Sequence, residues 1–312
     1  MMKIITVTAN TAIDWLIEVD GLGRQDNLSA NKHREFACGK GINVAKAVES
    51  LGYPSACLGF AGRQSLGLFN GLNSAFLHTD LIAVNGKTRT NITLIDQAAG
   101  REMHIRTSGY RVTADDCAML SEKIERTANA GDRVVFSGSL PSGAPSDFYR
   151  LLIDVCRRKR VLTVLDSSGQ SMAEGVKAAP DLIKPNLQEL EELAGCTLMD
   201  DRAILDATRA LLGLGVSKVC VSLGSKGVIA VDAERAFAVR VNHCPEQTVT
   251  QIGCGDTLVA GLAVGMLRGG RWEDGVKWGV ACATANLYSP EPGRFDKALA
   301  QEISRQIEMT PL

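Results

Sequence analysis

Short runs of β-branched and apolar residues alternate along the chain with longer amphipathic stretches. The runs that predict strands are Ile4–Thr8, Ser55–Phe60, Arg133–Ser137, Leu162–Asp166, Leu182–Lys184 and Lys218–Ser222. The stretches with helical periodicity between them are Ile42–Leu51, Asp115–Asn129, Ser146–Arg157, Leu187–Ala194 and Asp201–Leu214. Such alternation predicts an α/β fold, in which helices cover both faces of a mostly parallel sheet.

Two segments depart from this alternation. Residues 13–36 and 88–107 carry strand-like patterns, as in Thr90–Asp96, without a helical stretch nearby. We predict that they pair as a small antiparallel sheet and form a lid over the C-terminal edge of the large sheet. An exposed small sheet has strand edges and apolar surface to cover, so a homodimer joined through the lids is expected. Without a linker or repeat, residues 1–312 are predicted to form a single domain.

Composition excludes several other classes of protein. The chain has 312 residues, 45% of them hydrophobic, and a formal net charge of -1, so no overall positive field recruits nucleic acid. No apolar run is long enough to span a bilayer, and the N-terminus is unlike a signal peptide. The nine cysteines are scattered without a CxxC pair, which favours a reducing cytoplasm.

A glycine-rich turn precedes an apolar helical run near the C-terminus. Gly253, Cys254 and Gly255 lead into Asp256 and the run Leu258–Leu267. Backbone N–H groups of such a turn, together with the helix N-terminus, form a site for an anion. The same field is expected to stabilise Asp256 as a carboxylate that can accept a hydroxyl proton. The alternative is an ordinary Asp cap on a buried helix.

A second glycine motif lies near the start of the chain. Gly39 and Gly41 flank Lys40 just before a predicted helix, as in a loop whose backbone approaches a ligand closely. It is not a Walker A loop, because GxxxxGK[ST] is absent. The alternative interpretation is a tight turn with a solvated lysine.

Small and polar residues follow the predicted strands. Ligands of open parallel sheets bind beyond the carboxyl ends of the strands, which makes these positions candidates. They are Asn10 and Asp14, Ser137–Pro141, Asp166–Ser168, Lys184–Asn186 with Glu189, and Ser222–Gly227. Each segment alone is also compatible with an ordinary turn.

The two glycine motifs, Gly39–Ala45 and Gly253–Thr257, resemble the two signatures of the PfkB carbohydrate kinases. Lys184–Leu190 is similar to the N-x-x-E element of that family, and Val221–Gly227 to its nucleotide-binding strand and loop. The resemblance covers nearly the whole chain. It implies the ribokinase-like fold, a three-layer α/β/α sandwich with a mostly parallel central sheet and a small β-sheet lid.

Within the family, three further features look most like the branch of 1-phosphofructokinases and tagatose-6-phosphate kinases. They are Thr8-Ala9-Asn10 with Asp14, the turn Ser137–Pro141, and Ile252 before Gly253. The resemblance therefore implies a phosphotransferase with an alcohol acceptor. It would use ATP and Mg²⁺ to phosphorylate a hydroxyl of a ketohexose phosphate such as fructose 1-phosphate or tagatose 6-phosphate.

The resemblance also implies residue roles. Asp256 would act as the base, while the amides of Gly253, Cys254 and Gly255 would hold the phosphoryl group. The substrate would contact Asp14, Gly39, Lys40, Asn43, Arg89, Arg106 and Ser139. The nucleotide would contact Lys184, Asn186, Ser222, Gly224, Gly227 and Asn286, the last near the base. Glu189 would organise water around Mg²⁺, although Asn186 and Glu189 also have the spacing of a helix capping box.

Two departures from the family pattern leave questions open. Cys254 stands where the family usually has alanine, and its thiol could be acidified by the helix N-terminus. The segment Glu102–Tyr110 lacks the glutamate, asparagine and Gly-Pro pattern of the hexose-phosphate branch. The acceptor could therefore be an unphosphorylated sugar or a nucleoside, in which case Arg89 and Arg106 should point away from the cleft. A catalytically silent sugar-phosphate-binding regulator is the remaining alternative.

Overall fold

A large sheet forms the centre of the protein in its computed structural model, which describes all residues except 1, 22–26, 97–98, 242–247 and 268–269. In spatial order its strands are β14 (Ile307–Pro311), β13 (Ala236–Val241), β12 (Val228–Asp232), β11 (Lys218–Ser222), β10 (Leu182–Ile183), β9 (Leu162–Asp166), β8 (Arg133–Ser137), β1 (Ile4–Thr8), β4 (Ser55–Gly62) and β5 (Leu77–Val84). Neighbours from β11 to β5 are parallel, and those from β11 to β14 are antiparallel. The predicted mostly parallel sheet is confirmed.

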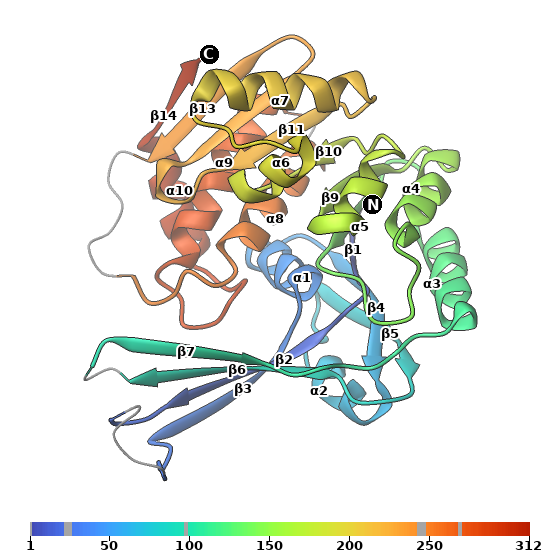
Figure 1. Ribbon diagram of the computed structural model, residues 1–312, viewed down its shortest axis with the longest axis vertical. Coiled ribbons are helices and arrows are strands. Elements are labelled where there is room, and N and C mark those ends of the chain that lie inside the picture. Colours follow the sequence, from blue (N-terminus) through green and yellow to red (C-terminus); the bar gives the residue numbers. More distant parts are fainter. Residues whose placement is uncertain (1, 22–26, 97–98, 242–247, 268–269) are drawn as a thin grey trace.

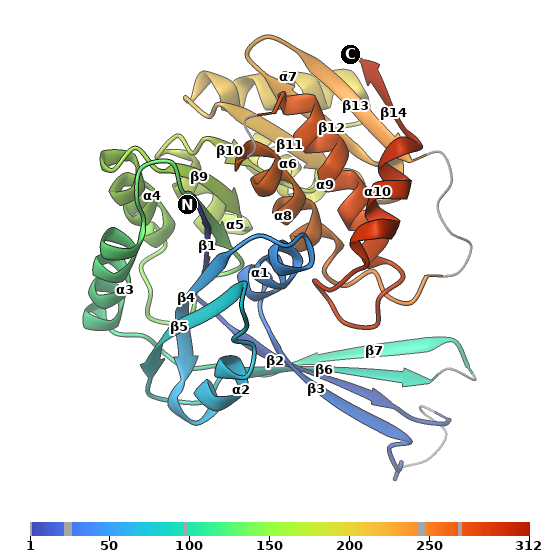
Figure 2. The same ribbon diagram turned by 180° about the vertical axis from the view of Figure 1, so that it is seen from behind.

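Helices cover both faces of this sheet (Figures 1 and 2). One face carries α3 (Ala114–Thr127), α4 (Phe148–Arg158), α5 (Gly169–Val176), α6 (Leu187–Ala194) and α7 (Asp201–Gly213). The other face carries α1 (Lys40–Ser50), α8 (Cys254–Leu267), α9 (Trp272–Asn286) and α10 (Lys297–Arg305). The short α2 (Leu66–Asn70) follows the 3₁₀ turn η1 (Arg63–Ser65), and a second 3₁₀ turn, η2 (Gly224–Lys226), follows β11. The predicted α/β/α sandwich is therefore confirmed.

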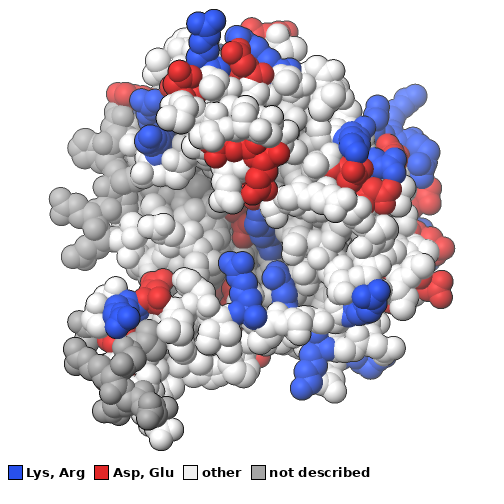
Figure 3. Space-filling model, in the orientation of Figure 1, with Lys and Arg blue, Asp and Glu red and all other residues white. Residues whose placement is uncertain are grey.

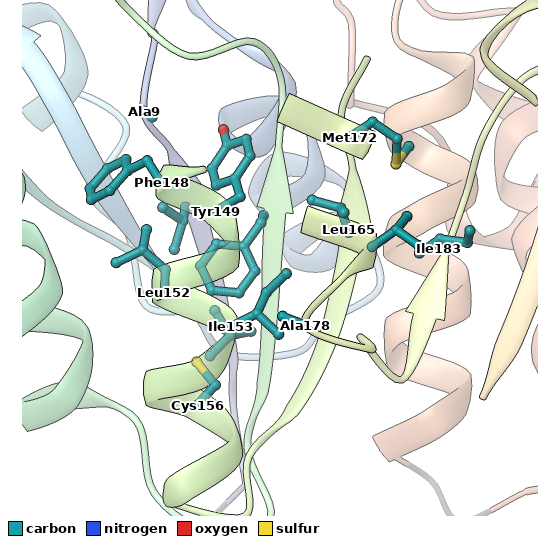
Figure 4. Packing of buried hydrophobic residues seen from close by; sticks show 14 of the residues in the cluster. Ala9, Phe148, Tyr149, Leu152, Ile153, Cys156, Leu165, Met172, Ala178 and Ile183 are labelled. Carbon is teal, nitrogen blue, oxygen red and sulfur yellow. The ribbon is translucent and has the colours of Figure 1, made fainter. Parts of the chain in front are cut away.

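Alternating side chains of the central strands fill two apolar layers. Phe136 and Leu165 face α4, where Phe136 packs against Tyr149 with ring centroids 5.8 Å apart. Figure 4 shows Tyr149 and Leu165 among the side chains of this layer. Val135 and Val164 point to the opposite face and pack with α1 and α8. Burial on both faces explains why these strands read as nearly continuous hydrophobic runs.

A smaller sheet projects from the carboxyl edge of the large one (Figure 1). Its strands lie in the order β3 (Lys32–Cys38), β2 (Ala12–Glu18), β6 (Arg89–Asp96) and β7 (Arg101–Arg106). These strands fall in the two segments that were expected to form the lid. The expected antiparallel arrangement is wrong for the central pair, because β2 and β6 are parallel. Both follow parallel strands of the large sheet, β1 and β5, and so leave its edge in the same direction.

Glycines allow α8 and α9 to pack unusually closely. A Cβ atom at Gly261 would lie 2.5 Å from Cα of Gly279, and one at Gly265 would lie 2.5 Å from Cα of Gly275. The two helices therefore touch backbone to backbone along two turns, which fixes the position of α8. Neither these helices nor others in the described part of the chain are long and apolar enough to cross a membrane.

Candidate active site

Polar side chains replace apolar ones at the carboxyl ends of neighbouring strands. Ser137 ends β8 and lies opposite Asp166, which ends β9. Lys184 follows β10, and Thr8 ends β1; all four side chains are buried. By the alternation of strand side chains, Ser137 and Asp166 share the sheet face on which α1 and α8 pack. A buried polar row therefore lies beneath the N-termini of these two helices.

Asp166 joins two lysines in this row. Its Oδ1 lies 3.1 Å from Nζ of Lys184 and 3.4 Å from Nζ of Lys40. Burial disfavours the Asp166 carboxylate, but the ammonium groups of Lys184 and Lys40 prevail and lower its pKa below the ordinary value. Asp166 in turn raises the pKa of Lys40 against the effect of burial. Asp166 thus holds Lys40 as a cation and has Lys184 on the same carboxylate oxygen.

The first glycine motif brings Lys40 to this position. A Cβ atom at Gly39 would lie 2.8 Å from Cγ2 of Thr8, and one at Gly41 would lie 2.4 Å from its Oγ1. The helix α1 can therefore begin directly against the end of β1. The glycines thus let the loop pack on β1, whereas its close approach to a ligand stays a prediction. Lys40 is paired with Asp166 rather than simply solvated.

The second glycine motif forms the turn that starts α8. Gly253 has a φ of +86°, a value that favours glycine, and α8 begins at Cys254. Asp256 is buried in the first turn of the helix, where Nδ2 of Asn43 donates to its Oδ2 at 2.8 Å. The thiol of Cys38 donates to Oδ1 of Asn43 at 3.4 Å, which leaves the amide nitrogen facing Asp256. The two glycine motifs thus meet at Asp256.

Burial sets the protonation behaviour of Asp256. Desolvation and the nearby charge of Asp166 raise the pKa of Asp256 to about 7, while Lys40, Asn43 and Lys184 oppose the shift. The expected stabilisation of the carboxylate by the turn is therefore wrong for the protein alone. A carboxyl group with a pKa near neutrality suits a general base.

A cavity of about 530 Å³ connects this turn to the loops predicted to bind nucleotide, a size within the usual range of ligand sites. The residues that line it include Asn186, Ser222, Gly224, Gly227, Thr248, Gln251, Cys254, Gly255, Leu258, Val280, Ala283, Thr284 and Leu287. Segments between Asn186 and Leu287 thus line one space. Polar loops form one side of it, and apolar residues of α8 and α9 form the other.

Asn186 and Glu189 form a reciprocal capping box at the start of α6. Oδ1 of Asn186 accepts from the Glu189 N–H at 2.8 Å, and Oε2 of Glu189 accepts from the Asn186 N–H at 2.9 Å. The capping alternative is therefore confirmed. Glu189 also lies close enough to raise the pKa of Lys40, so its charge reaches the site. Within the described residues no cluster of three or more His, Cys, Asp or Glu side chains could hold a metal ion, so the assignment of Glu189 to Mg²⁺ stays a prediction.

One expectation about the turn needs correction, and the nucleotide contact predicted for Asn286 stays a prediction. Burial raises the pKa of Cys254 to about 11, so the hypothesis of an acidified thiol is wrong. Asn286, predicted near the nucleotide base, is fully buried and has hydrogen bonds from both of its amide atoms to protein groups. The position of Asn286 below the turn follows from its place at the end of α9.

The remaining substrate candidates lie on the small sheet and beside it. Asp14, Asn91 and Arg106 are directly opposite one another on β2, β6 and β7, and Nδ2 of Asn91 donates to Oδ1 of Asp14 at 2.7 Å. Arg106 is exposed on the same face of the sheet as Asp14. Lys and Arg side chains gather at the centre of this side of the molecule, between the small sheet and the main body (Figure 3).

Asn10 connects two other candidates. A terminal nitrogen of Arg89 donates to the carbonyl of Asn10 at 3.2 Å, and Nδ2 of Asn10 donates to Oγ of Ser139 at 3.2 Å. Arg89 is half-buried, and its Nε is buried without a hydrogen-bond partner. These side chains are therefore oriented by the turn after β1 and are not simply solvated.

Comparison with known proteins identifies the family of the chain. The sequence model of a family described as "pfkB family carbohydrate kinase" matches residues 2–296. The chain is 32% identical over 292 residues to a 1-phosphofructokinase of Borreliella burgdorferi, covering 90% of this chain and 91% of that protein. It is 31% identical over 290 residues to the ATP-dependent 6-phosphofructokinase isozyme 2 of Mycobacterium tuberculosis H37Rv, covering 92% and 85%. Phosphofructokinase-2 from Escherichia coli has the same fold, with a TM-score of 0.90 over 98% of this chain and 99% of that chain at 24% identity. The chain belongs to the pfkB family of carbohydrate kinases.

Proposed function

We propose that this kinase transfers the γ-phosphoryl group of ATP to a hydroxyl of a ketohexose phosphate, of the fructose 1-phosphate or tagatose 6-phosphate type. The observation that carries the proposal is the cavity that joins Ser222 and Gly224 to Cys254 and Gly255, with Asp256 in the next residue. A nucleotide in that cavity would point its phosphates toward Asp256, whose pKa of about 7 suits a general base.

Asp256 is assigned the proton transfer. Its carboxylate accepts the proton of the sugar hydroxyl as that oxygen forms its bond to the phosphorus and the bond to the ADP oxygen breaks. With a pKa of about 7, a large fraction of Asp256 is carboxylate at neutral pH. That carboxylate is also more basic than an ordinary one, so it accepts the hydroxyl proton more readily. Asn43, which donates to Oδ2, would orient the carboxylate toward the hydroxyl.

The charge of the transferring group would be offset by the turn and the lysines. The N–H groups of Gly253, Cys254 and Gly255 lie at the start of α8, where the helix dipole favours an anion. Lys40 and Lys184 are fixed by Asp166 and need little rearrangement during the reaction. Fixed charges of this kind are effective in phosphoryl transfer because positioning and electrostatics supply most of the catalysis.

The nucleotide would lie along Asn186, Ser222, Gly224 and Gly227. Gly227 is required by the backbone, since its φ is +86° and a Cβ atom would lie 2.1 Å from the Val239 carbonyl oxygen. Mg²⁺, when bound, would neutralise part of the phosphate charge. The residues present fit a hydrated ion held mainly by phosphates and water, with Glu189 as an outer carboxylate, because Mg²⁺ seldom needs an all-protein cage.

The acceptor sugar is assigned to the space between the small sheet and α1. Asp14 is suited to accept hydrogen bonds from sugar hydroxyls, and Gly39, Lys40 and Asn43 at the start of α1 are assigned to the same acceptor. Arg106 shares the sheet face of Asp14. This arrangement favours a phosphorylated acceptor over a neutral sugar or nucleoside, since a guanidinium group binds phosphate well.

A screen of acceptors tests this assignment. ADP release from ATP and Mg²⁺ would be measured with free hexoses, nucleosides and ketohexose phosphates. We expect turnover with a ketohexose phosphate, and Arg106→Ala should raise KM for that acceptor by about tenfold or more while KM for ATP stays unchanged. Arg63→Ala, on η1, is the matched control for loss of an exposed arginine. Turnover confined to unphosphorylated acceptors would contradict the proposal.

A homodimer and a cytoplasmic location belong to the same proposal. One face of the small sheet carries most of its apolar residues, beside Glu35, His33 and Thr90. The apolar members are Ile13, Trp15, Ile17, Ile92, Leu94, Met103 and Ile105. Met103 and Ile105 are 47% and 45% exposed, and a second small sheet could cover them. The eight cysteines in the described residues are free thiols, which supports a reducing compartment such as the cytoplasm.

A further inference from the structure

The amide of Asn286 joins three parts of the chain around the phosphoryl-binding turn. Its Nδ2 donates to the carbonyl of Ile252 at 3.0 Å and approaches Sγ of Cys254 at 3.6 Å. Its Oδ1 accepts from the N–H of Gly293 at 2.9 Å and lies 3.2 Å from Oγ1 of Thr257, a hydroxyl that also donates to the carbonyl of Gly253 at 2.7 Å. The partners of the Asn286 amide thus lie in the turn, in α8 and in the loop after α9.

The loop that Asn286 holds also touches the residue that orients the base. Gly293 is packed so tightly that a Cβ atom there would lie 2.5 Å from the carbonyl oxygen of Asn43. Pro292 packs against the other side of the turn, 3.0 Å from a Cβ atom built at Gly253. A displacement of the loop would therefore reach both the amides of the turn and the Asn43 contact to Asp256.

Two ion pairs attach the same loop to α1. Lys46, whose side chain is 1% exposed, pairs with Glu291 at 2.8 Å. Arg294 pairs with Glu49 one turn further along α1. The loop is thus a rigid connector between α1, which carries Lys40 and Asn43, and the turn, to which Asn286 fixes it.

We propose that Asn286 is a positioning residue for phosphoryl transfer. It fixes the position of the Gly253–Gly255 amides relative to the Asp256 carboxylate and touches neither substrate. The inference rests on the proposed kinase function and assigns Asn286 a role other than nucleotide recognition. The turn amides act on the migrating phosphoryl group. A displacement of these amides relative to Asp256 therefore destabilises the transition state more than the bound substrates.

The test compares Asn286→Leu, which keeps the volume and removes the amide, with Leu152→Ala, a core variant on α4 away from the turn. For Asn286→Leu we expect kcat to fall about 10- to 100-fold, with KM for ATP and for the acceptor within about threefold of wild type. Hydrogen exchange of peptides covering residues 252–257 should accelerate in this variant. Leu152→Ala should lower the melting temperature while leaving kcat and that exchange unchanged.

The result that would overturn the inference is a folded Asn286→Leu protein with wild-type kcat, or one whose loss lies mainly in KM for ATP. If Asn286→Leu does not fold, Thr257→Val and Thr257→Ser carry the test, because only the serine keeps a hydroxyl between Oδ1 of Asn286 and the carbonyl of Gly253. Rescue of kcat by serine is then expected, and equal activity of the two variants contradicts the inference. Hydrogen exchange needs no turnover, so a wild-type protein without kinase activity would contradict the proposed function and leave the exchange result to decide the role of Asn286.

Discussion

Asp256 is a buried acid whose neighbours act on its charge in opposite directions. Desolvation and the charge of Asp166 raise its pKa, and Lys40, Asn43 and Lys184 limit the rise to about 7. The same lysines keep Asp166 ionised, because they approach its Oδ1 directly. Two carboxyl groups in one site therefore have different protonation behaviour, and the one beside the turn is suited to proton transfer.

This pKa shift predicts how stability depends on pH. The folded-state pKa of Asp256, about 7, lies above its ordinary value of 3.8, so the folded protein binds the proton more tightly than the unfolded chain does. The free energy of unfolding should fall as pH rises from about 4 to 7, because the buried group must then lose its proton.

Asp256→Asn removes this effect. At pH 8, thermal unfolding should give a higher melting temperature for the variant than for wild type. The difference in the free energy of unfolding should be on the order of a few kcal/mol. The difference should shrink at pH 5, where the wild-type carboxyl is mostly protonated in the fold. A variant that is less stable than wild type at pH 8 would contradict the assigned pKa shift.

Local motifs predict part of the site at residue scale. Lys40, Asn43 and Asp256 lie within glycine motifs whose chemistry is visible in the sequence, and the structure brings them together. The role of Asp166 was not predicted, since it depends on two lysines from distant segments, although its position at the end of a strand was a usable signal. The hydrogen bonds of Asn286 to the turn were not predicted, because the sequence does not reveal which side of α9 meets the turn.

At the scale of elements, the position of the Gly253–Gly255 turn depends on how α8 packs. The glycines on α8 and α9 are four residues apart on each helix, and they allow the backbones to meet. Buried parallel strands were predictable because their hydrophobic runs are continuous. Strands β5, β12, β13 and β14 were not predicted, because edge and antiparallel strands depend more on their neighbours than on their own sequence.

Gly261→Ala should disturb this packing. The added methyl group would meet Gly279 Cα at 2.5 Å, and we expect a loss of about 1–3 kcal/mol in the free energy of unfolding. Gly213→Ala is the matched control, since Gly213 ends α7 with open space around it and alanine favours a helix by about 0.5–1 kcal/mol. Urea unfolding of both variants measures the difference. Equal stabilities would contradict the close contact.

At the scale of the whole molecule, the site lies where the two sheets and the N-termini of α1 and α8 meet. The strand β3 leads from the small sheet straight into α1, so Asp14 and Lys40 are brought to the same side of the protein. The small sheet was predictable from its alternating pattern. Its parallel central pair was not, because that orientation comes from the large sheet to which both strands are attached.

The apolar face of the small sheet predicts association in solution. Ile105→Glu should shift the protein from dimer to monomer, because a buried charge at the contact is costly. Met119→Glu, on α3 and 52% exposed, is the control for a charge placed on another exposed apolar residue. Sedimentation equilibrium distinguishes the two states. A wild-type protein that is monomeric at high concentration, or an Ile105→Glu protein as dimeric as wild type, would contradict the prediction.

The central claim, that Asp256 is the base of a phosphoryl transfer to a ketohexose phosphate, is tested most directly by the pH dependence of kcat/KM for that acceptor in wild type and in Asp256→Asn. The wild-type value should rise with pH and level off above about 7, since only the carboxylate accepts the hydroxyl proton. Asp256→Asn should be slower by about 10²–10⁴-fold and should lack that rise. An Asp256→Asn protein that turns over at the wild-type rate would contradict the account.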